Sequence, residues 1–531
     1  MASYCSLLYV GIFLPAVVLC YAVVPQRHRG KVLLAASYAF FWSVSGKLIV
    51  FLLASSFSLH HFGLWLTHVV QEERDRMLAA VDKAERKAVR AAFQRRLRRI
   101  LLFAVLLHIG TLVTLKYAAF FSVNLNRLLD AFRLPFTLPV PAFLLPIGIS
   151  FYSLQAVSYL IDVYRGTVRA DRNLGRLMLF LGFFPQIMEG PICRYGQTAL
   201  PLWEGRPLTW KNLTFGMQRI LFGMMKKIVI ADRLNILIKN VFSSPATFDG
   251  GITALAMVCY TCQLYMEFSG TMDVVIGSAE IFGIRLPENF RQPFFSASIQ
   301  EFWMRWHITL GAWFKDYIFY PLSMSGPLKK LTGAARRRLG SHFGPLLAGS
   351  VALFAVWLCN GLWHGAGWQY IFFGLYHFAL ILCGSLTAPL SQRIAGALHI
   401  DRDAGPWRMF RIARTALLVC VGELFFRADG LRAGLSMFRR MVTDFSLRSF
   451  TDGTFLGLGM DKHDFFIVIV AVLLVFAVGL MRERGISLRE TVARQHIAVR
   501  WSVYYAAILF VIIFGAYGIG YVPVDPIYAA F

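Results

Sequence analysis

Apolar runs of roughly twenty residues recur along the chain, and short polar connections that carry most of the basic residues separate them. A helix that spans a bilayer needs about 20 consecutive, mostly apolar residues, so this pattern predicts an all-α, polytopic membrane protein. The first run, 7–24, has no basic segment before it and no small-residue cleavage site after it. We therefore interpret it as a retained span and not as a removed signal peptide.

Basic residues orient the next runs. The connection 71–99 holds ten Lys or Arg against five acids, which places it on the cytoplasmic side under the positive-inside rule. The runs 31–41 and 47–69 before it predict a pair of helices that cross out and back. The basic stretch itself predicts one amphipathic helix, which we expect to lie on anionic lipid rather than to dock a soluble partner.

A less regular segment follows, in which Pro185 and Pro191 interrupt an apolar run. Broken helices at membrane depth are tolerated only where protein or a water-filled cavity satisfies the backbone, so we expect this segment to line a cavity. A later apolar run carries Glu267 and Asp273. These two acids could bind a proton or an ion, as in a transporter, but we favour their pairing with Lys or Arg as structural props.

Two histidines stand in apolar, aromatic-rich sequence: His307 in EFWMRWHITLGAWFKDY and His364 in NGLWHGAGW. A titratable side chain at bilayer depth is a functional candidate by default. A neutral imidazole can accept a proton from a hydroxyl near pH 7, and burial favours this base form. Gly361, Gly365 and Gly367 allow a close backbone approach beside the second imidazole. The pair therefore suggests proton-transfer chemistry inside a membrane.

The segment around the first histidine predicts a helix that begins near Ser298 and continues through it. Glu301 and Arg305 stand four residues apart and can form an ion pair. Aromatic and apolar residues recur at three- or four-residue spacing, which indicates one helical face. This face consists of Trp303, Trp306, Leu310, Trp313 and Tyr317.

The formal net charge of +25 is also typical of nucleic-acid-binding proteins. Here the basic residues cluster beside apolar runs, where topology and membrane lipid account for them, so we expect no nucleic-acid partner. Among the scattered cysteines, Cys259 and Cys262 have the spacing of a redox or metal pair, but no second pair or nearby His completes a zinc set. We expect two thiols one helical turn apart and no metal site.

Six segments, in order over residues 30–430, resemble the membrane-bound O-acyltransferase family, and within it the bacterial branch that modifies alginate and teichoic acids. They are PIGISFYSLQAVSYLIDVYRG, FFPQIMEGPICRY, FGMMKKIVIADRL, LPENFRQPF, EFWMRWHITLGAWFKDYIFYPL and GLWHGAGW. The later GELFFRADG and DPIYAAF resemble the polysaccharide-acetylating members. Two residues depart from the pattern: Glu267 stands where the branch commonly has Asp, and Gly367 where acetyltransferases often have Asn. These departures bear on which donor or acceptor is used.

The resemblance implies a bundle of roughly 11–13 transmembrane helices, with re-entrant and interfacial helices, around a central tunnel in the bacterial cytoplasmic membrane. It implies transfer of an acyl group, with acetyl favoured, from a cytoplasmic thioester on coenzyme A or a carrier protein to an extracytoplasmic polysaccharide or cell-wall polymer. No bound cofactor is expected. D-alanyl transfer to teichoic acid is the alternative, and a secondary transporter is less favoured. A separate extracytoplasmic, hydrolase-like acyltransferase is expected as a partner.

The resemblance also implies roles for residues. His364 matches the principal catalytic histidine, and we expect it to be the general base; His307 is expected to position the donor or the developing oxyanion. The residues expected to bind substrate or line the tunnel are Asn360, Trp363, Trp306, Arg305, Trp303, Asp316, Glu189 and Gln186.

These expectations divide the chain into four parts. N-terminal transmembrane helices occupy 1–70, the cytoplasmic basic helix 71–99, the catalytic core 100–430 and C-terminal transmembrane helices 431–531. After His377, apolar runs predict further spans, to which we assign no chemistry.

Overall fold

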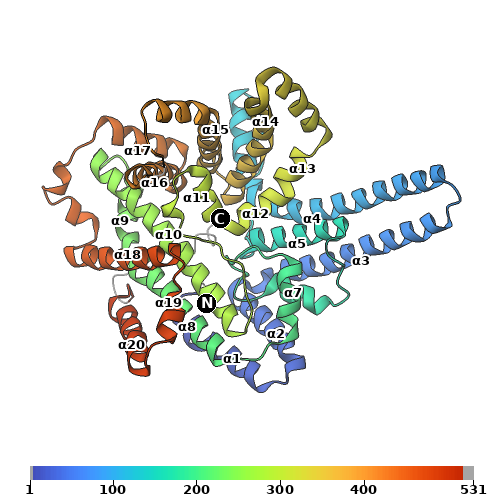
Figure 1. The fold of residues 1–531 in the computed structure, drawn as a ribbon, viewed down its shortest axis with the longest axis horizontal. Coiled ribbons are helices and arrows are strands. Elements are labelled where there is room, and N and C mark those ends of the chain that lie inside the picture. The colour runs from blue at the N-terminus through green and yellow to red at the C-terminus, as the bar shows by residue number, and fades with distance from the viewer. Residues whose placement is uncertain (1–3, 403, 518–531) are drawn as a thin grey trace. The chain divides into compact units, whose positions relative to one another are not determined.

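The computed structural model describes residues 4–402 and 404–517, and this part of the chain is built from helices without a β-strand. The expected all-α architecture is confirmed. The chain divides into two compact units (Figure 1). The first holds residues 4–217 and 275–287, and the second holds 218–274 and 288–517. Two helices, α8 (Trp210–Met224) and α10 (Gly250–Ile281), contribute residues to both units.

Six stretches of the described residues are long and apolar enough to cross a membrane. This number is below the roughly 11–13 spans expected, although the first stretch contains two helices. Several predicted spans form short helices: α5 (Ile149–Arg165) has 17 residues, which at 1.5 Å per residue is less than the roughly 30 Å of a hydrocarbon core. The run 7–24 likewise forms a shorter apolar helix, Leu8–Val23. The six stretches are Gln26–Ala79, Lys83–Ala131, Gly326–His364, Trp368–Ala397, Lys462–Glu483 and Ile497–Phe514.

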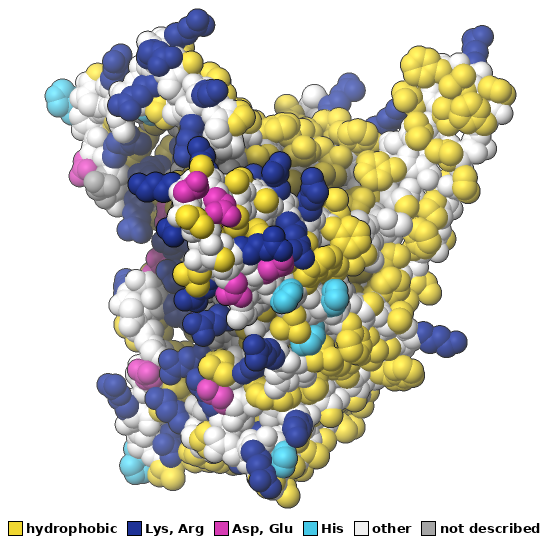
Figure 2. Space-filling view, turned by 90° about the vertical axis from the view of Figure 1, so that its right-hand side faces the viewer, with side chains coloured by type: hydrophobic (Ala, Val, Ile, Leu, Met, Phe, Trp, Pro, Cys, Tyr) yellow, Lys and Arg dark blue, Asp and Glu magenta, His cyan; other side chains and the backbone are white. Residues whose placement is uncertain are grey.

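The first unit contains a long antiparallel hairpin of α3 (Ile49–Ala79) and α4 (Lys83–Ala131) (Figure 1). The basic stretch, predicted as a single helix, is instead divided between the end of α3 and the start of α4. The Asp82 side chain accepts a hydrogen bond from the Glu85 backbone N–H at 2.6 Å, and such an N-cap begins a new helix. Figure 2 shows basic side chains gathered with fewer acidic ones beside a broad apolar surface, as expected of a segment next to lipid.

The remaining helices of the first unit are shorter and surround the predicted interruption. Residues 183–194 are non-helical and almost fully buried, which confirms the broken apolar run. The Tyr4 hydroxyl donates to the Phe184 carbonyl at 2.8 Å and accepts from the Met188 N–H at 3.1 Å. A protein side chain thus provides hydrogen bonds to backbone groups of this non-helical segment. The helices are α1 (Leu14–Val23), α2 (Gln26–Ser45), α6 (Leu174–Gly182) and α7 (Tyr195–Glu204).

The second unit centres on α14 and α15, which pack side by side (Figure 1). The predicted continuous helix from Ser298 is wrong: α11 ends at Arg305, α12 begins at Ile308, and His307 between them has φ +46°. The predicted pair of Glu301 and Arg305 is confirmed at 2.9 Å. The helices of this unit are α9 (Asp232–Ser243), α11 (Ile299–Arg305), α12 (Ile308–Phe314), α13 (Tyr320–Ser323), α14 (Gly326–His364), α15 (Trp368–Ala397), α16 (Gly405–Arg427), α17 (Leu431–Thr443), α18 (Lys462–Glu483), α19 (Leu488–Ala493) and α20 (Ile497–Phe514).

The two acids of α10 form buried ion pairs in the second unit. Asp273 accepts from Arg219 at 2.9 Å and from Lys226 at 2.6 Å. Glu267 pairs with Lys227 at 2.8 Å. Buried charges are stable only when they are paired in this way. The predicted pairing of these two acids with Lys or Arg is therefore confirmed.

Candidate active site

Both candidate histidines line one cavity of about 80 Å³ in the second unit. Among the predicted site residues, Trp303, Trp306 and Asn360 line it as well. They come from α11, the turn before α12, and α14. Since a water molecule takes up about 30 Å³ in the liquid, this space suits a group of a few non-hydrogen atoms.

Close packing of α14 against α15 positions Asn360 and His364. A Cβ atom at Gly361 would lie 2.4 Å from the Tyr370 carbonyl oxygen, so only glycine permits this approach. The expected role of this glycine is confirmed. Asn360 and His364 are four residues apart near the C-terminal end of α14, so both project from one face of the helix.

A hydrogen-bonded turn holds His307. The Asn289 amide oxygen accepts from the Thr309 N–H at 3.1 Å, from the Thr309 hydroxyl at 2.9 Å, and lies 3.2 Å from His307 Nδ1. Because a backbone N–H can only donate, the amide oxygen faces this turn, and His307 Nδ1 carries the proton. His307 Nε2 is then the nitrogen with the lone pair.

The surroundings of His307 keep it neutral. His307 lies outside the six candidate spans and is 3% exposed. Burial lowers the pKa of its imidazole to about 3, because the charged form loses its hydration. The Phe268 ring contacts it edge-on at a centroid distance of 4.9 Å. The residue is therefore neutral at neutral pH and can accept a hydrogen bond, but it is too weakly basic to take up a proton.

Trp363 and Asn360 complete the surroundings of the two histidines. The Trp363 ring contacts both imidazoles, with centroids 5.4 Å from His307 and 5.0 Å from His364. Asn360 is 8% exposed, and its amide oxygen has no hydrogen-bond partner within the described residues. A buried polar atom in this state is destabilising by about 1–3 kcal/mol unless a ligand pairs with it. The Asn360 amide oxygen is thus positioned to accept a hydrogen bond from a hydroxyl group.

The other predicted site residues lie elsewhere. Arg305 does not line the cavity and instead pairs with Glu301 and, at 2.7 Å, with Glu483. Asp316 lies in the π-helical turn Lys315–Phe319 that follows α12. Gln186 and Glu189 belong to the first unit, where the Gln186 amide donates to the Phe180 carbonyl at 2.9 Å. Their placement in a tunnel stays a prediction.

Sequence reasoning missed several residues that line the site or orient its side chains. Trp357 lines the cavity one turn before Asn360, and this helical spacing could have identified it. Asn289 stands inside the LPENFRQPF segment without any local sign that it orients a histidine. His377 also stands in an apolar run, which was itself a signal. Within the described residues, no group of three His, Cys, Asp or Glu could hold a metal ion.

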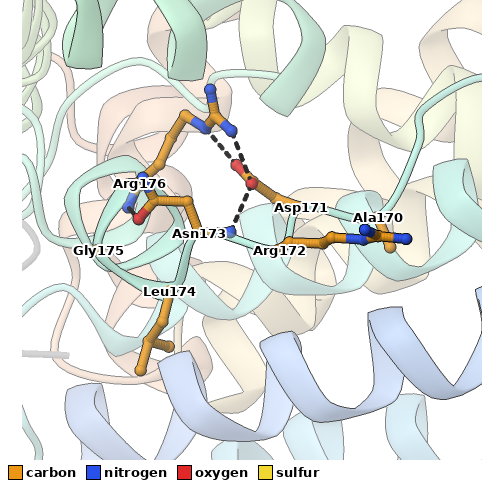
Figure 3. A pocket seen from close by; sticks show the side chains of 7 residues that line it. All are labelled: Ala170, Asp171, Arg172, Asn173, Leu174, Gly175 and Arg176. Atoms are coloured by element: carbon orange, nitrogen blue, oxygen red, sulfur yellow. Dashed lines mark hydrogen bonds and ion pairs between the residues drawn. The ribbon is translucent and has the colours of Figure 1, made fainter.

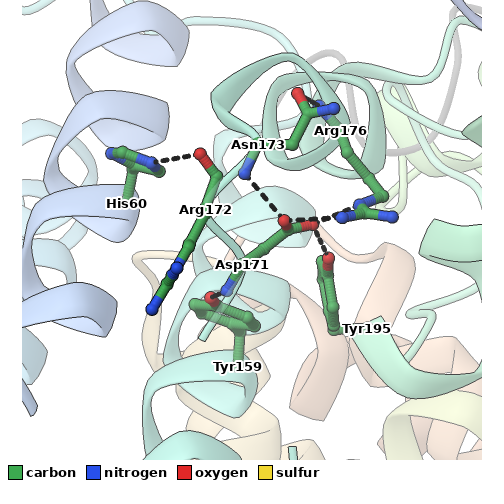
Figure 4. A network of polar contacts seen from close by, with 7 residues as sticks. All are labelled: His60, Tyr159, Asp171, Arg172, Asn173, Arg176 and Tyr195. Carbon is green, nitrogen blue, oxygen red and sulfur yellow. Dashed lines mark hydrogen bonds and ion pairs between the residues drawn. The ribbon is translucent and has the colours of Figure 1, made fainter. Parts of the chain in front are cut away.

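A second recess, open and about 760 Å³ in volume, lies in the first unit and is lined by residues 170–176 (Figure 3). The Asp171 carboxylate accepts from Arg176, from the Tyr195 hydroxyl and from the Asn173 N–H, whereas Arg172 points away (Figure 4). Burial alone would raise the pKa of Asp171, but the hydrogen bonds from Arg176 and Tyr195 outweigh burial and lower it. This carboxylate holds the start of α6 and is not a proton donor.

Comparison with known proteins places these residues in context. Residues 173–334 match the membrane-bound O-acyltransferase family, a range that includes His307 and ends before His364. The chain is 34% identical over 443 residues to the probable alginate O-acetylase AlgI of Pseudomonas putida, which covers 82% of this chain and 80% of that protein. It is 28% identical over 369 residues to the peptidoglycan O-acetyltransferase of Helicobacter pylori, or 64% of each chain. It is 31% identical over 245 residues to the teichoic acid D-alanyltransferase of Bacillus subtilis, or 45% of this chain and 58% of that protein.

Proposed function

This multi-pass protein belongs to the membrane-bound O-acyltransferase family, and from that premise we propose which group it transfers and how. It moves a short acyl group, with acetyl favoured, from a cytoplasmic thioester to hydroxyls of an extracytoplasmic polysaccharide or cell-wall polymer, across the bacterial inner membrane. The observation that carries the proposal is the single cavity shared by His307 and His364. Similarity to proteins named for alginate and peptidoglycan O-acetylation supports the acetyl group.

In this proposal His364 is the general base. It takes the proton of the acceptor hydroxyl as the oxygen attacks the thioester carbonyl carbon and the new C–O bond forms. The tetrahedral intermediate then collapses, the C–S bond breaks, and the thiolate leaves. The proton on His364 passes to that thiolate, which leaves an ester, a free thiol and a neutral imidazole.

The neighbouring groups support this transfer in different ways. With its proton on Nδ1, His307 accepts a hydrogen bond at Nε2, so it is suited to positioning a substrate and not to donating to an oxyanion. Donors for the developing oxyanion are the Asn360 amide nitrogen and the Trp306 indole N–H, both on residues that line the cavity.

The donor, partner and acceptor follow from the same proposal. A cavity of about 80 Å³ accommodates an acetyl or a D-alanyl group, and the donor is a thioester of coenzyme A or of a carrier protein. The thioester acts as a co-substrate, and the transfer needs no bound cofactor. A separate extracytoplasmic, hydrolase-like acyltransferase is the expected partner that completes delivery to the polymer. D-alanyl transfer to teichoic acid is the alternative, supported by the similarity to a D-alanyltransferase.

The test uses a deletion strain complemented with wild-type protein, His364→Ala or His108→Ala at matched membrane levels. Ester-linked acyl groups on cell-surface polymers are measured by NMR and mass spectrometry. His108 is the control because it is a histidine on α4 that is 5% exposed, as is His364. Loss of a general base removes roughly 10²- to 10⁴-fold in rate, so we expect His364→Ala to lose the ester and His108→Ala to keep it.

Each outcome decides one part of the proposal. An acetyl ester that disappears with the deletion supports acetyl transfer, and a D-alanyl ester supports the alternative. Full restoration by His364→Ala overturns the assignment of the base. A deletion strain whose surface esters are unchanged overturns the transfer itself.

A further inference from the structure

Another buried histidine, His377 on α15, lies behind the cavity and is 0% exposed. The Trp303 indole N–H donates to His377 Nδ1 at 3.2 Å. An indole nitrogen can only donate, so Nδ1 bears the lone pair and His377 carries its own proton on Nε2. The hydrogen bond therefore fixes both the tautomer of His377 and the orientation of Trp303.

The surroundings of His377 hold its ring in place. It stacks on Trp357, with centroids 5.6 Å apart and planes at 29°, and Phe373 contacts it edge-on at 4.7 Å. On α16, a Cβ atom at Gly422 would lie 2.6 Å from His377 Nε2. An imidazole confined between three helices has little freedom to rotate, so it provides a fixed acceptor for Trp303.

Trp303 and Trp357 form one wall of the cavity that contains the two catalytic candidates. Their rings meet edge-on with centroids 4.9 Å apart, and both line the space of about 80 Å³. A longer acyl chain would need the volume that these rings occupy. The orientation of Trp303 therefore decides how much room an acyl group has.

We propose that Trp303 sets the maximum length of the acyl group, and that His377 is a positioning residue that holds the Trp303 indole in that wall. The proposal rests on the acyl transfer proposed above and deepens it by naming the substrate class: thioesters of short acyl groups. An extra methylene in an apolar pocket changes selectivity by roughly 10- to 200-fold. A wall of two tryptophans thus excludes a butyryl group strongly.

The experiment measures chain-length selectivity in membranes that contain the full-length protein. Acetyl-CoA and butyryl-CoA are supplied with surface polymer from the deletion strain, and the ratio of butyryl to acetyl ester is determined by mass spectrometry. The variants are Trp303→Ala, Trp303→Phe, His377→Phe and His377→Gln. His342→Phe is the control because His342 is exposed, its Nε2 lies 3.2 Å from the Ser385 carbonyl oxygen, and it does not line the cavity.

We expect Trp303→Ala to raise the butyryl-to-acetyl ratio at least tenfold, since it opens the wall. His377→Phe deletes only the hydrogen bond, so it should raise the ratio by a smaller factor. Trp303→Phe deletes the same hydrogen bond and also part of the ring, so its ratio should lie between those of His377→Phe and Trp303→Ala. His377→Gln retains an acceptor oxygen and should return the ratio toward the wild-type value. The control should leave the ratio unchanged.

A purely structural role for His377 predicts a different result. In that case His377→Phe lowers acetyl and butyryl transfer equally and leaves the ratio at the wild-type value, which overturns the positioning role. An unchanged ratio in Trp303→Ala overturns the length limit. If His377→Phe fails to reach the membrane, a wild-type ratio in Trp303→Phe overturns the role of the hydrogen bond, because that variant lacks the donor. Absence of acetyl transfer by the wild-type protein counts against the proposed function and not against this inference.

Discussion

Replacing Asn289 tests the link between one buried amide and the orientation of a catalytic candidate. Asn289 is 0% exposed, and its amide oxygen serves two donor groups on Thr309 and His307 Nδ1. Asn289→Ala removes this acceptor and leaves three donors without it. We expect the turn at His307 to relax, because φ +46° is strained for a residue other than glycine.

The magnitude follows from the number of groups affected. Each donor left unsatisfied in a buried site destabilises by about 1–3 kcal/mol, and relaxation of the turn recovers about 1–3 kcal/mol of backbone strain. With three donors affected, a net loss of about 2–6 kcal/mol in the free energy of unfolding remains. A shift of about 1 Å in a reacting group lowers a rate by roughly 10²-fold, so acyl transfer should fall by that factor.

Two assays follow the variant. The initial rate of ester formation from the acetyl thioester is measured in membranes, and thermal stability is measured on the detergent-solubilised protein. Asn240→Ala is the matched control, because the Asn240 side chain on α9 donates to the Leu458 carbonyl at 3.0 Å and does not line the cavity. The control should lose some stability and retain the wild-type rate at permissive temperature.

Asn289→Asp adds a pH readout. It keeps an acceptor oxygen but places a negative charge beside His307, which raises the pKa of that imidazole from its lowered value of about 3. Protonation of His307 should therefore not affect the wild-type rate between pH 5 and pH 8. The rate of Asn289→Asp should fall as the pH is lowered, because His307 becomes protonated at a higher pH in this variant. Wild-type rates and pH profiles for both Asn289 variants would refute the role of this amide.

Two further predictions concern packing and charge. Gly374→Ala should lower the rate of acyl transfer at least tenfold and destabilise the protein. The added Cβ would lie 2.3 Å from the Trp357 carbonyl oxygen and would push α14 away from α15. Gly384→Ala is the control and should behave as wild type in the same assays, because a Cβ at Gly384 would have no atom within 4 Å. Asp171→Asn should lower thermal stability at pH 7. The pKa of Asp171 is lower in the folded protein than in the unfolded chain, where it is about 3.9. The ionised carboxylate therefore stabilises the fold above that pH, and this stabilisation is lost as the pH falls through the folded-state pKa. The difference in thermal stability between Asp171→Asn and wild type should thus disappear at acid pH. A Gly384→Ala protein as impaired as Gly374→Ala, or an Asp171→Asn difference that is constant with pH, would contradict these arguments.

The sequence alone determined the class of protein and the two central histidines. The length of an apolar run and the position of its charges are local properties, and they predict membrane helices without any knowledge of packing. His307 and His364 were recognisable because an ionisable group in such a run is conspicuous. The ion pair of Glu301 with Arg305 was also local, since both residues lie on one helix turn.

Only the tertiary structure decided how these residues meet. Helical periodicity predicts an unbroken helix through His307. Instead, the amide oxygen of Asn289, which lies 18 residues earlier in the chain, accepts hydrogen bonds from this turn and stabilises a left-handed residue where α11 ends. The cavity forms because α11 packs near α14 and α15, which brings Trp303 to His377. Such contacts join segments far apart along the chain, so no local pattern specifies them, and the shape of the site depends on the packing of whole helices.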